Sequence, residues 1–193
     1  MTKKPKLVGS SPGAVNNVFE ELAAHHVAVL ATVGEDGLPH QTVVYYSINS
    51  DFTITFATKK ETLKYLNIQG DNNVRMLVYD EKTLLTIQVY GKANESTDEK
   101  QKTKAIEDMY WAADQNDHEL PPLTKLYAGE LVVFEVSPVH MHMAYFIRPQ
   151  AGGYDTFETL DFGEGIDKKR VKISGLKPSL DKDRTVIEQT DIG

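Results

Sequence analysis

The sequence predicts a mainly β, α+β fold in which an antiparallel sheet curls into a closed or nearly closed barrel with peripheral helices. Two observations predict it. At least six segments have the pattern of consecutive strands, and tight hairpins join most of them. Helical segments are few, and we expect them to lie at the periphery of the sheet. This combination is typical of small antiparallel barrels.

The first part of the chain is expected to form a helix and then a hairpin. The helix covers about Pro12 to Ala24, with Ser11 as its cap and apolar residues at helical spacing. A β-rich strand follows from His26 to Val33. The turn Gly34–Pro39 then leads into the return strand His40–Ile48.

The middle of the chain is expected to alternate strand, helix and hairpin. A strand covers Phe52–Ala57, and a short helix runs from about Lys60 to Gln69. Gly70 is a good C-cap for that helix. Strands Asn73–Tyr79 and Thr83–Lys92 follow, joined by a three-residue turn.

The last part completes the predicted sheet. Residues 97 to about 113 form a charged amphipathic helix, and Asp114–Pro122 is a polar loop. Two more strands cover Glu130–Val136 and His140–Ile147. Residues 150–193 are rich in glycine, acids and lysine, which is typical of a loosely held polar extension or an edge strand.

Composition agrees with one cytoplasmic domain, which we place at residues 1–149. A chain of 193 residues is long enough for one well-filled core and short for two. The chain has no cysteine, which excludes disulfides and thiolate chemistry. The N-terminus has no signal-like apolar run, and no stretch is long enough to span a membrane. A net charge of −7 argues against general binding to nucleic acid or anionic membranes.

The segment 54–64 carries the strongest functional signal. It begins as a strand and turns into a helix at Thr58, where Thr58-x-x-Glu61 has the spacing of a capping box. The start of a helix has unpaired N–H groups and the positive end of the dipole, both of which suit an anion. The hydroxyls and ammonium groups that could join them belong to Thr58, Thr62, Lys59, Lys60 and Lys64. A solvated, capped helix without a ligand is the competing interpretation.

Residues 29–93 resemble the flavin-binding split-barrel family typified by pyridoxamine 5'-phosphate oxidase. The order and spacing of several motifs carry the resemblance, and the family pattern fits without a gap. These motifs are Val29–Val33, Gly34–Pro39, His40–Tyr46, Phe56-x-Thr58-x-x-x-Thr62-x-Lys64, Gly70–Val74 and Val89–Ala93. The resemblance implies a split barrel that pairs as a homodimer, with FMN in a cleft shared by the two subunits.

The resemblance also implies which residues contact the flavin. The backbone of one strand would run along the isoalloxazine ring, a strand end and a helix start would hold the phosphate, and one side chain would face the ring from a third strand. In that order the residues are Thr42, Val43, Val44 and Tyr45; Ala57, Thr58, Thr62 and Lys64; and Thr86. No side chain can be nominated as the catalytic acid or base.

Two departures from the oxidase argue against pyridoxamine phosphate oxidase activity. Leu63 stands where the oxidase has an arginine, which removes a bidentate phosphate donor. Lys59 and Lys60 could compensate as point charges. The closing Trp and Arg-x-His substrate segment of the oxidase is not found, and the counterpart region is Val139–Tyr145.

Three other pairs of side chains are candidates for a functional or a structural role. His140-x-His142 places two rings on one face of a strand, but no third ligand is evident, so we expect no metal site. His25-His26 is expected to stabilise a helix end through the dipole. Tyr110-Trp111 could wall a flavin pocket, although packing of the helix end on the barrel is the favoured interpretation.

The leading hypothesis is therefore an FMN-dependent oxidoreductase that acts on a small molecule, with a reduced nicotinamide as a candidate electron donor. Two alternatives stay open. The chain could be a non-catalytic flavoprotein that stores, senses or shuttles FMN or electrons. It could also be a related split barrel that uses a deazaflavin or haem, with His140 and His142 as candidate haem ligands.

Overall fold

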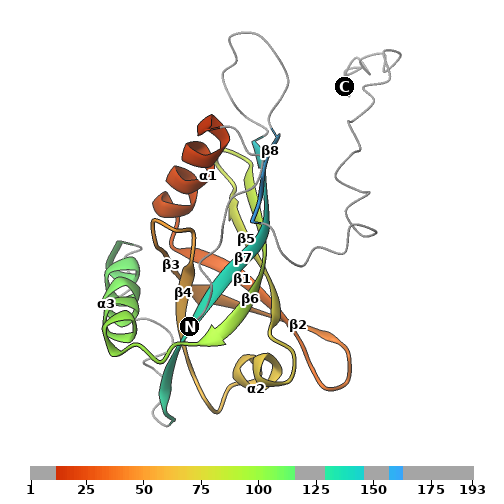
Figure 1. Ribbon diagram of the computed structural model, residues 1–193, viewed down its shortest axis with the longest axis vertical. Coiled ribbons are helices and arrows are strands. Elements are labelled where there is room, and N and C mark those ends of the chain that lie inside the picture. Colours follow the sequence, from red (N-terminus) through yellow and green to blue (C-terminus); the bar gives the residue numbers. More distant parts are fainter. Residues whose placement is uncertain (1–11, 116–128, 146–156, 163–193) are drawn as a thin grey trace, which may run out of the picture.

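The computed structural model describes residues 12–115, 129–145 and 157–162. Its helices and strands form a curled antiparallel sheet with three helices around it, in agreement with the predicted split barrel (Figure 1). The elements are α1 (Pro12–Ala24), β1 (Val27–Val33), β2 (Pro39–Tyr45), β3 (Ser47–Ile48), β4 (Ile54–Lys59), α2 (Leu63–Gly70), β5 (Asn73–Asp80), β6 (Leu85–Glu95), α3 (Glu99–Gln115), β7 (Leu131–Tyr145) and β8 (Phe157–Asp161).

The sheet curls because consecutive strands lie at its opposite ends. The strand order is β2-β1-β5-β6-β7-β4-β3, and β8 adds to β7. Only Tyr46 separates β2 from β3, so the chain itself connects the two ends of the sheet. The Tyr46 ring is buried, its hydroxyl donates to the carbonyl oxygen of Leu22 at 2.9 Å, and its N–H donates to that of His26. The predicted continuous strand His40–Ile48 was therefore wrong, since it breaks at this seam.

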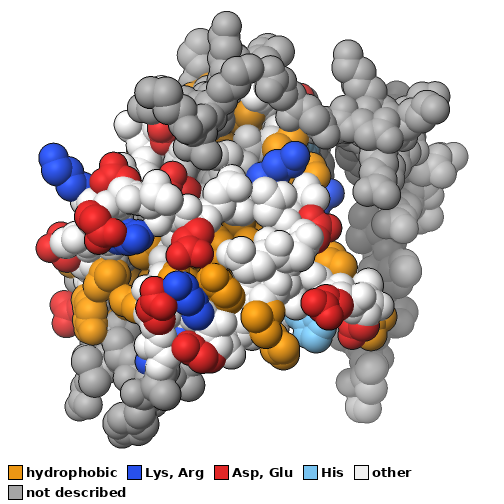
Figure 2. Space-filling model, turned by 60° about the horizontal axis from the view of Figure 1, so that its bottom comes forward, with side chains coloured by type: hydrophobic (Ala, Val, Ile, Leu, Met, Phe, Trp, Pro, Cys, Tyr) orange, Lys and Arg blue, Asp and Glu red, His pale blue; other side chains and the backbone are white. Residues whose placement is uncertain are grey.

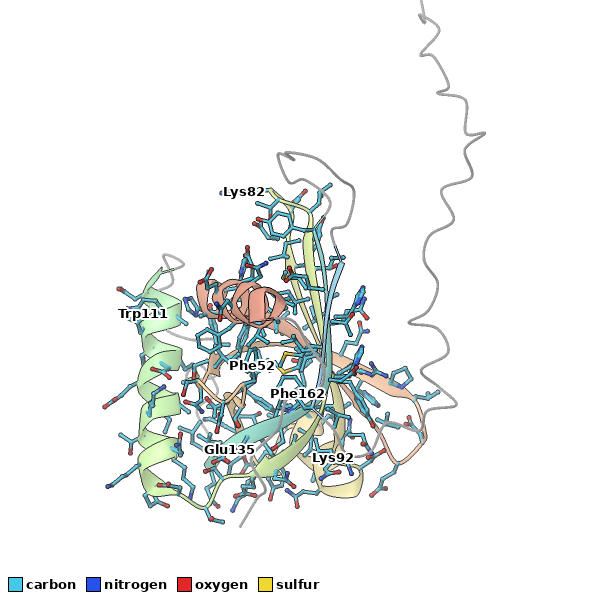
Figure 3. The ribbon with its side chains drawn as sticks, turned by 45° about the horizontal axis from the view of Figure 1, so that its top comes forward. Phe52, Lys82, Lys92, Trp111, Glu135 and Phe162 are labelled. Atoms are coloured by element: carbon cyan, nitrogen blue, oxygen red, sulfur yellow. The ribbon has the colours of Figure 1, made fainter. Side chains whose placement is uncertain are left out.

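The main core lies inside the curl. Its largest fully buried side chains come from β1, β4, β5, β6, β7, β8 and α1, and include Phe56, Phe134, Leu30, Ile87, Met141 and Leu22. Helix α1 covers the upper end, where Phe19 meets Phe52 edge to face and Phe52 lies 5.4 Å from Phe162 between ring centroids (Figure 3). Apolar spacing along α1 had predicted this helix, and its bounds agree with the prediction.

Strand β7 differs from the sequence prediction. Two separate strands were expected over 130–136 and 140–147, but one strand of 15 residues runs through Pro138. A bulge makes this possible, since Tyr90 pairs with His140 whereas Gly91 pairs with Pro138. A Cβ atom on Gly91 would lie 2.7 Å from Val136 Cγ1 and 2.8 Å from the Ser137 oxygen, so the bulge needs a glycine there.

Strand β8 lies within the 150–193 segment and pairs with β7 from His140↔Asp161 to Ala144↔Phe157. The predicted loop 114–122 falls mainly outside the described residues, as does the cap at Ser11. None of the described helices is both long enough and apolar enough to cross a membrane.

The outer face of β2, β1 and β5 carries exposed apolar side chains in register. Val43, Val29 and Leu77 form one cross-strand row, and Tyr45, Val27 and Tyr79 form the next. The exposed fraction is 63% for Val43 and 55% for Tyr79. The inner face of the same strands is core, so β2 is apolar on both faces.

Candidate functional site

The candidate anion site lies where β4 ends and α2 begins, at the lower end of the molecule in Figure 1. The predicted capping box is wrong. Thr58 is still part of β4, and the helix starts five residues later at Leu63. Glu61 accepts a bond from the Glu130 N–H at 3.3 Å. Thr62 is the N-cap residue, yet its side chain gives no capping bond to the described helix amides.

The Thr58 and Thr62 hydroxyls are brought together, as predicted for a shared site. Their Oγ1 atoms are 3.0 Å apart, and Thr58 is fully buried. Thr62 donates its own proton to the Lys59 carbonyl at 2.8 Å, so the proton between the two hydroxyls comes from Thr58. Both protons are therefore used inside the turn. The pair fixes the strand-to-helix corner, and an anion would receive a hydroxyl proton only after a rotation.

Lys64 is the cation of this corner. Its side chain is half-buried, and burial lowers the pKa of its ammonium group from the usual value. No carboxylate in the described part of the chain lies within ion-pair distance of Lys64. A partly buried ammonium without a carboxylate partner carries a desolvation cost that a bound anion would offset.

The neighbouring lysines do not act as expected. Lys60 is paired with Glu130, with 2.8 Å between Nζ and Oε1, so it does not replace the missing arginine at Leu63. Figure 2, which brings this end forward, shows basic and acidic side chains interleaved with apolar ones rather than a single basic patch. The expected local positive patch therefore loses Lys60, whose charge is balanced by Glu130.

Strand β2 offers main-chain groups at a free edge. In the described sheet β2 pairs with β1 alone. The Tyr46 N–H to His26 carbonyl bond fixes the pattern, so Thr42 and Val44 direct their main-chain groups at β1. Val43 and Tyr45 direct theirs to the open edge. Planar ligands with alternating donors and acceptors suit such an edge, as the resemblance implied for the flavin ring.

Side-chain packing joins the β2 edge to the end of β4. Tyr45 packs with Ala57 in a small cluster that also contains Val133 of β7 and Ala105 and Met109 of α3. Helix α3 thus covers the two predicted contact strands through small residues and one methionine. The favoured packing of Tyr110 and Trp111 on the barrel is only partial, because they stay 45% and 53% exposed while the Trp111 ring contacts the His26 ring beside β1.

Thr86 is not brought to the other predicted residues within one chain. It lies on β6 opposite Tyr79, which neighbours Val27 and then Tyr45 across the sheet. Three strand spacings separate Thr86 from Tyr45, about 14 Å. Thr86 faces outward as Tyr45 does, so the two side chains do not form one compact site within the described part of the chain.

The histidine pairs have protein partners. His140 Nδ1 lies 2.6 Å from Asp161 Oδ1, and His142 Nδ1 lies 3.3 Å from Thr159 Oγ1. Burial, assisted by His140, lowers the pKa of His142. No group of three or more potential metal ligands occurs among the described residues. His25 Nδ1 donates to the Glu21 carbonyl at 2.7 Å and so caps the end of α1.

Two contacts of this region were missed from the sequence. Asn67 of α2 donates to Thr32 of β1 at 3.0 Å, and both side chains are buried. This bond ties the helix to the barrel. The Lys60–Glu130 pair joins residues 70 positions apart, and no local pattern in the sequence reports such a contact.

Comparison with known proteins agrees with the split-barrel fold. The family model described as "Pyridoxamine 5'-phosphate oxidase" matches residues 15–143, more than half of the chain. Comparison with curated proteins gives no significant match.

Solved structures share the fold at low sequence identity. A putative pyridoxamine 5'-phosphate oxidase from Listeria innocua is 21% identical with a TM-score of 0.51, over 66% of this chain and 94% of that one. An F420 reductase is 23% identical with a TM-score of 0.51, over 64% and 94%. A heme binding protein from Mycobacterium smegmatis is 13% identical with a TM-score of 0.55, over 80% and 59%. At these identities the likeness shows the fold alone.

Proposed function

Because the chain belongs to the pyridoxamine 5'-phosphate oxidase family, we propose that it binds FMN and acts as an oxidoreductase on a small organic molecule. One observation carries the cofactor assignment. Lys64, the second residue of α2, has a half-buried ammonium group with no carboxylate partner among the described residues. The side chain of Thr62 does not cap the start of this helix. A phosphate dianion fits both features, since it accepts charge-assisted bonds from the ammonium and from free helix amides.

Two parts of the protein would hold the cofactor, the β4–α2 corner and the edge of β2. Lys64 and the first amides of α2 would hold the phosphate, while the Thr58–Thr62 pair keeps that corner rigid. The main-chain groups of Val43 and Tyr45 at the β2 edge would orient the ring, and α3 would exclude water behind Tyr45 and Ala57. When bound, the flavin supplies the redox chemistry.

The proposed activity is not that of a pyridoxamine phosphate oxidase. Leu63, at the position of the family arginine, is 63% exposed, and its side chain has no hydrogen-bond donor for a phosphate. In the counterpart of the oxidase's substrate segment, His140 and His142 are engaged by Asp161 and Thr159 of β8. We propose another small-molecule substrate, with a reduced nicotinamide as the electron donor.

The proposed assembly is a homodimer formed through the outer face of β2, β1 and β5. Val43 and Leu77 leave apolar surface in water on this face, and pairing across a two-fold axis would cover it. Pairing could also bring Thr86 of a second chain toward the β2 edge. Light scattering should give twice the chain mass of 21.6 kDa, and Leu77→Glu should shift the protein toward monomer. A wild-type monomer that binds FMN would contradict this assembly.

The cofactor is tested by titrating flavin-free protein with FMN and with riboflavin. We expect FMN fluorescence to change with a dissociation constant of about 1 μM or below, near −8 kcal/mol. Riboflavin should bind more weakly because it lacks the phosphate. Absence of any FMN response at tens of micromolar would overturn the assignment. Bleaching of bound flavin by reduced nicotinamide then separates an enzyme from a carrier.

Haem is the second candidate, and the geometry of His140 favours it. The Nδ1 atom of His140 is held by the Asp161 carboxylate, which leaves Nε2 as the ring nitrogen for a metal. A Soret band in the purified protein, lost in His140→Ala, would favour haem over flavin. Mass analysis of whatever is released on denaturation separates FMN from a deazaflavin.

A further inference from the structure

A cavity of about 540 Å³ lies away from the β4–α2 corner that is proposed to hold the phosphate. It is formed where α1 ends and β1 begins, with walls from β5 and α3. Its described side chains are Ala23, Ala24, His25, His26, Val27, Tyr79 and Trp111. This volume is within the range of small-molecule sites in proteins. None of these lining residues belongs to the proposed phosphate site.

Two aromatic side chains give the cavity its chemistry. Trp111 and Tyr79 are 53% and 55% exposed, although both residue types usually bury most of their surface. Figure 3 shows Trp111 on α3, toward the end of that helix that lies level with α1. The His26 ring lies 4.7 Å from the Trp111 ring between centroids, at an interplanar angle of 82°. This edge-to-face contact holds the indole in place before any ligand arrives.

The charges around the cavity are unsuited to an anion. None of the described lining residues is Lys or Arg. Burial and the neighbouring His25 lower the pKa of His26, which keeps that ring neutral at pH 7 even though Asp108 acts in the opposite direction. Hydrogen bonds from Thr83 and from the Lys82 N–H lower the pKa of Asp80, so a carboxylate lies 3.9 Å from His25 Nε2.

We propose that this cavity binds a planar aromatic ring that is uncharged or positively charged. Trp111 and Tyr79 supply aromatic rings for stacking and cation–π contacts, and the neutral His26 ring adds a hydrogen-bonding group. The nearby Asp80 favours a cation over an anion.

The cavity also lies next to the strand proposed for the flavin ring. Val27, in its wall, is paired with Tyr45 of β2. Resting on the proposed function, this neighbourhood makes the cavity the pocket for the aromatic part of the substrate or the electron donor. The binding of the ring itself does not depend on the flavin.

Trp111 makes the test direct because it is the single tryptophan of the chain. Flavin-free protein is titrated with three probes of the same ring: nicotinamide, which is uncharged, 1-methylnicotinamide, a cation, and nicotinate, an anion. We expect saturable quenching of Trp111 emission by the first two with an unchanged fluorescence lifetime, because a stacked complex forms before excitation. Nicotinate should bind at least about tenfold more weakly.

Two variants decide where the probe binds. Tyr79→Ala should weaken nicotinamide binding about tenfold, whereas Tyr110→Ala, which changes an exposed neighbour of Trp111 outside the wall, should leave it unchanged. Linear quenching with a shortened lifetime, equal affinity for nicotinate, or no effect of Tyr79→Ala would each overturn the proposal. Repeating the titration with FMN present tests whether the cavity lies next to the flavin ring. A spectral change of the bound flavin would support this position. If the probe binds and FMN does not, only the proposed cofactor is refuted.

Discussion

Replacing Lys64 by methionine should separate ligand binding from stability at the β4–α2 corner. Methionine keeps the length and the apolar stem of the lysine but removes the charge. Since burial disfavours the ammonium in the ligand-free protein, the variant should unfold at the same denaturant concentration or a slightly higher one. FMN binding should weaken, because a charge-assisted hydrogen bond to the phosphate contributes about 1.5–3 kcal/mol. That range corresponds to roughly ten- to 150-fold in the dissociation constant.

The assay compares FMN and riboflavin titrations of Lys64→Met with those of a matched lysine variant. Lys60→Met is the control, since the Lys60 ammonium is already paired with Glu130 and is more exposed. FMN affinity should change less than about twofold in Lys60→Met, and riboflavin affinity should stay unchanged in both variants. Equal losses for FMN and riboflavin in Lys64→Met would refute the reasoning, as would a clear loss of stability.

The pH dependence follows from the same burial. The pKa of Lys64 lies below its unfolded value, so the unfolded chain binds more protons through the alkaline range, and stability of the ligand-free protein should rise with pH there. FMN affinity should move the opposite way, since deprotonation removes the charge that holds the phosphate. Lys64→Met should flatten both dependences, measured by denaturant unfolding and by FMN titration between pH 8 and pH 10 (roughly the range below the usual lysine value).

Three further predictions concern the scaffold. Gly91→Ala should cost about 1–3 kcal/mol in the free energy of unfolding, because its Cβ would meet Val136 and the Ser137 oxygen, whereas Gly70→Ala, with open space around the new Cβ, should stay within about 0.5 kcal/mol. His142 has a pKa below 6.5, so stability should fall as pH falls from 6.5 through that lower value, and His142→Gln should reduce this slope in urea unfolding at pH 7 and pH 5. Tyr46→Phe should cost about 1–3 kcal/mol, seen as a lower melting temperature in calorimetry, because it leaves the buried Leu22 carbonyl without its donor.

The sequence was informative where local pattern determines structure. Apolar spacing and a proline at the first position predicted α1, and the glycine-containing turn predicted the β1–β2 hairpin. It failed where a distant contact decides the outcome. The strand through Pro138 depends on a bulge that only the opposing Gly91 permits, and the break at Tyr46 depends on where β4 and β3 end up in the sheet.

The candidate site shows the same division. The resemblance placed Thr58, Thr62 and Lys64 near one another, and the structure brings the two hydroxyls together. The capping box was wrong because Glu61 binds the backbone of Glu130 and Lys60 binds its side chain. Both contacts are to Glu130, which is about 70 positions away in the sequence, so no helix-start motif can predict them.

The seam at Tyr46 also constrains how this protein can fold. The β2 edge and the β4 corner lie toward the two ends of the sheet, and the single residue Tyr46 joins β2 to β3, the strand beside β4. Neither end can reach its final place until β5, β6 and β7 have assembled between them, which makes the closing contacts distant in sequence and slow to form. The β2 edge and the β4–α2 corner should therefore form in the same kinetic step. A folding intermediate that retains half of the cofactor site is not expected, and FMN should accelerate only the last stage of refolding.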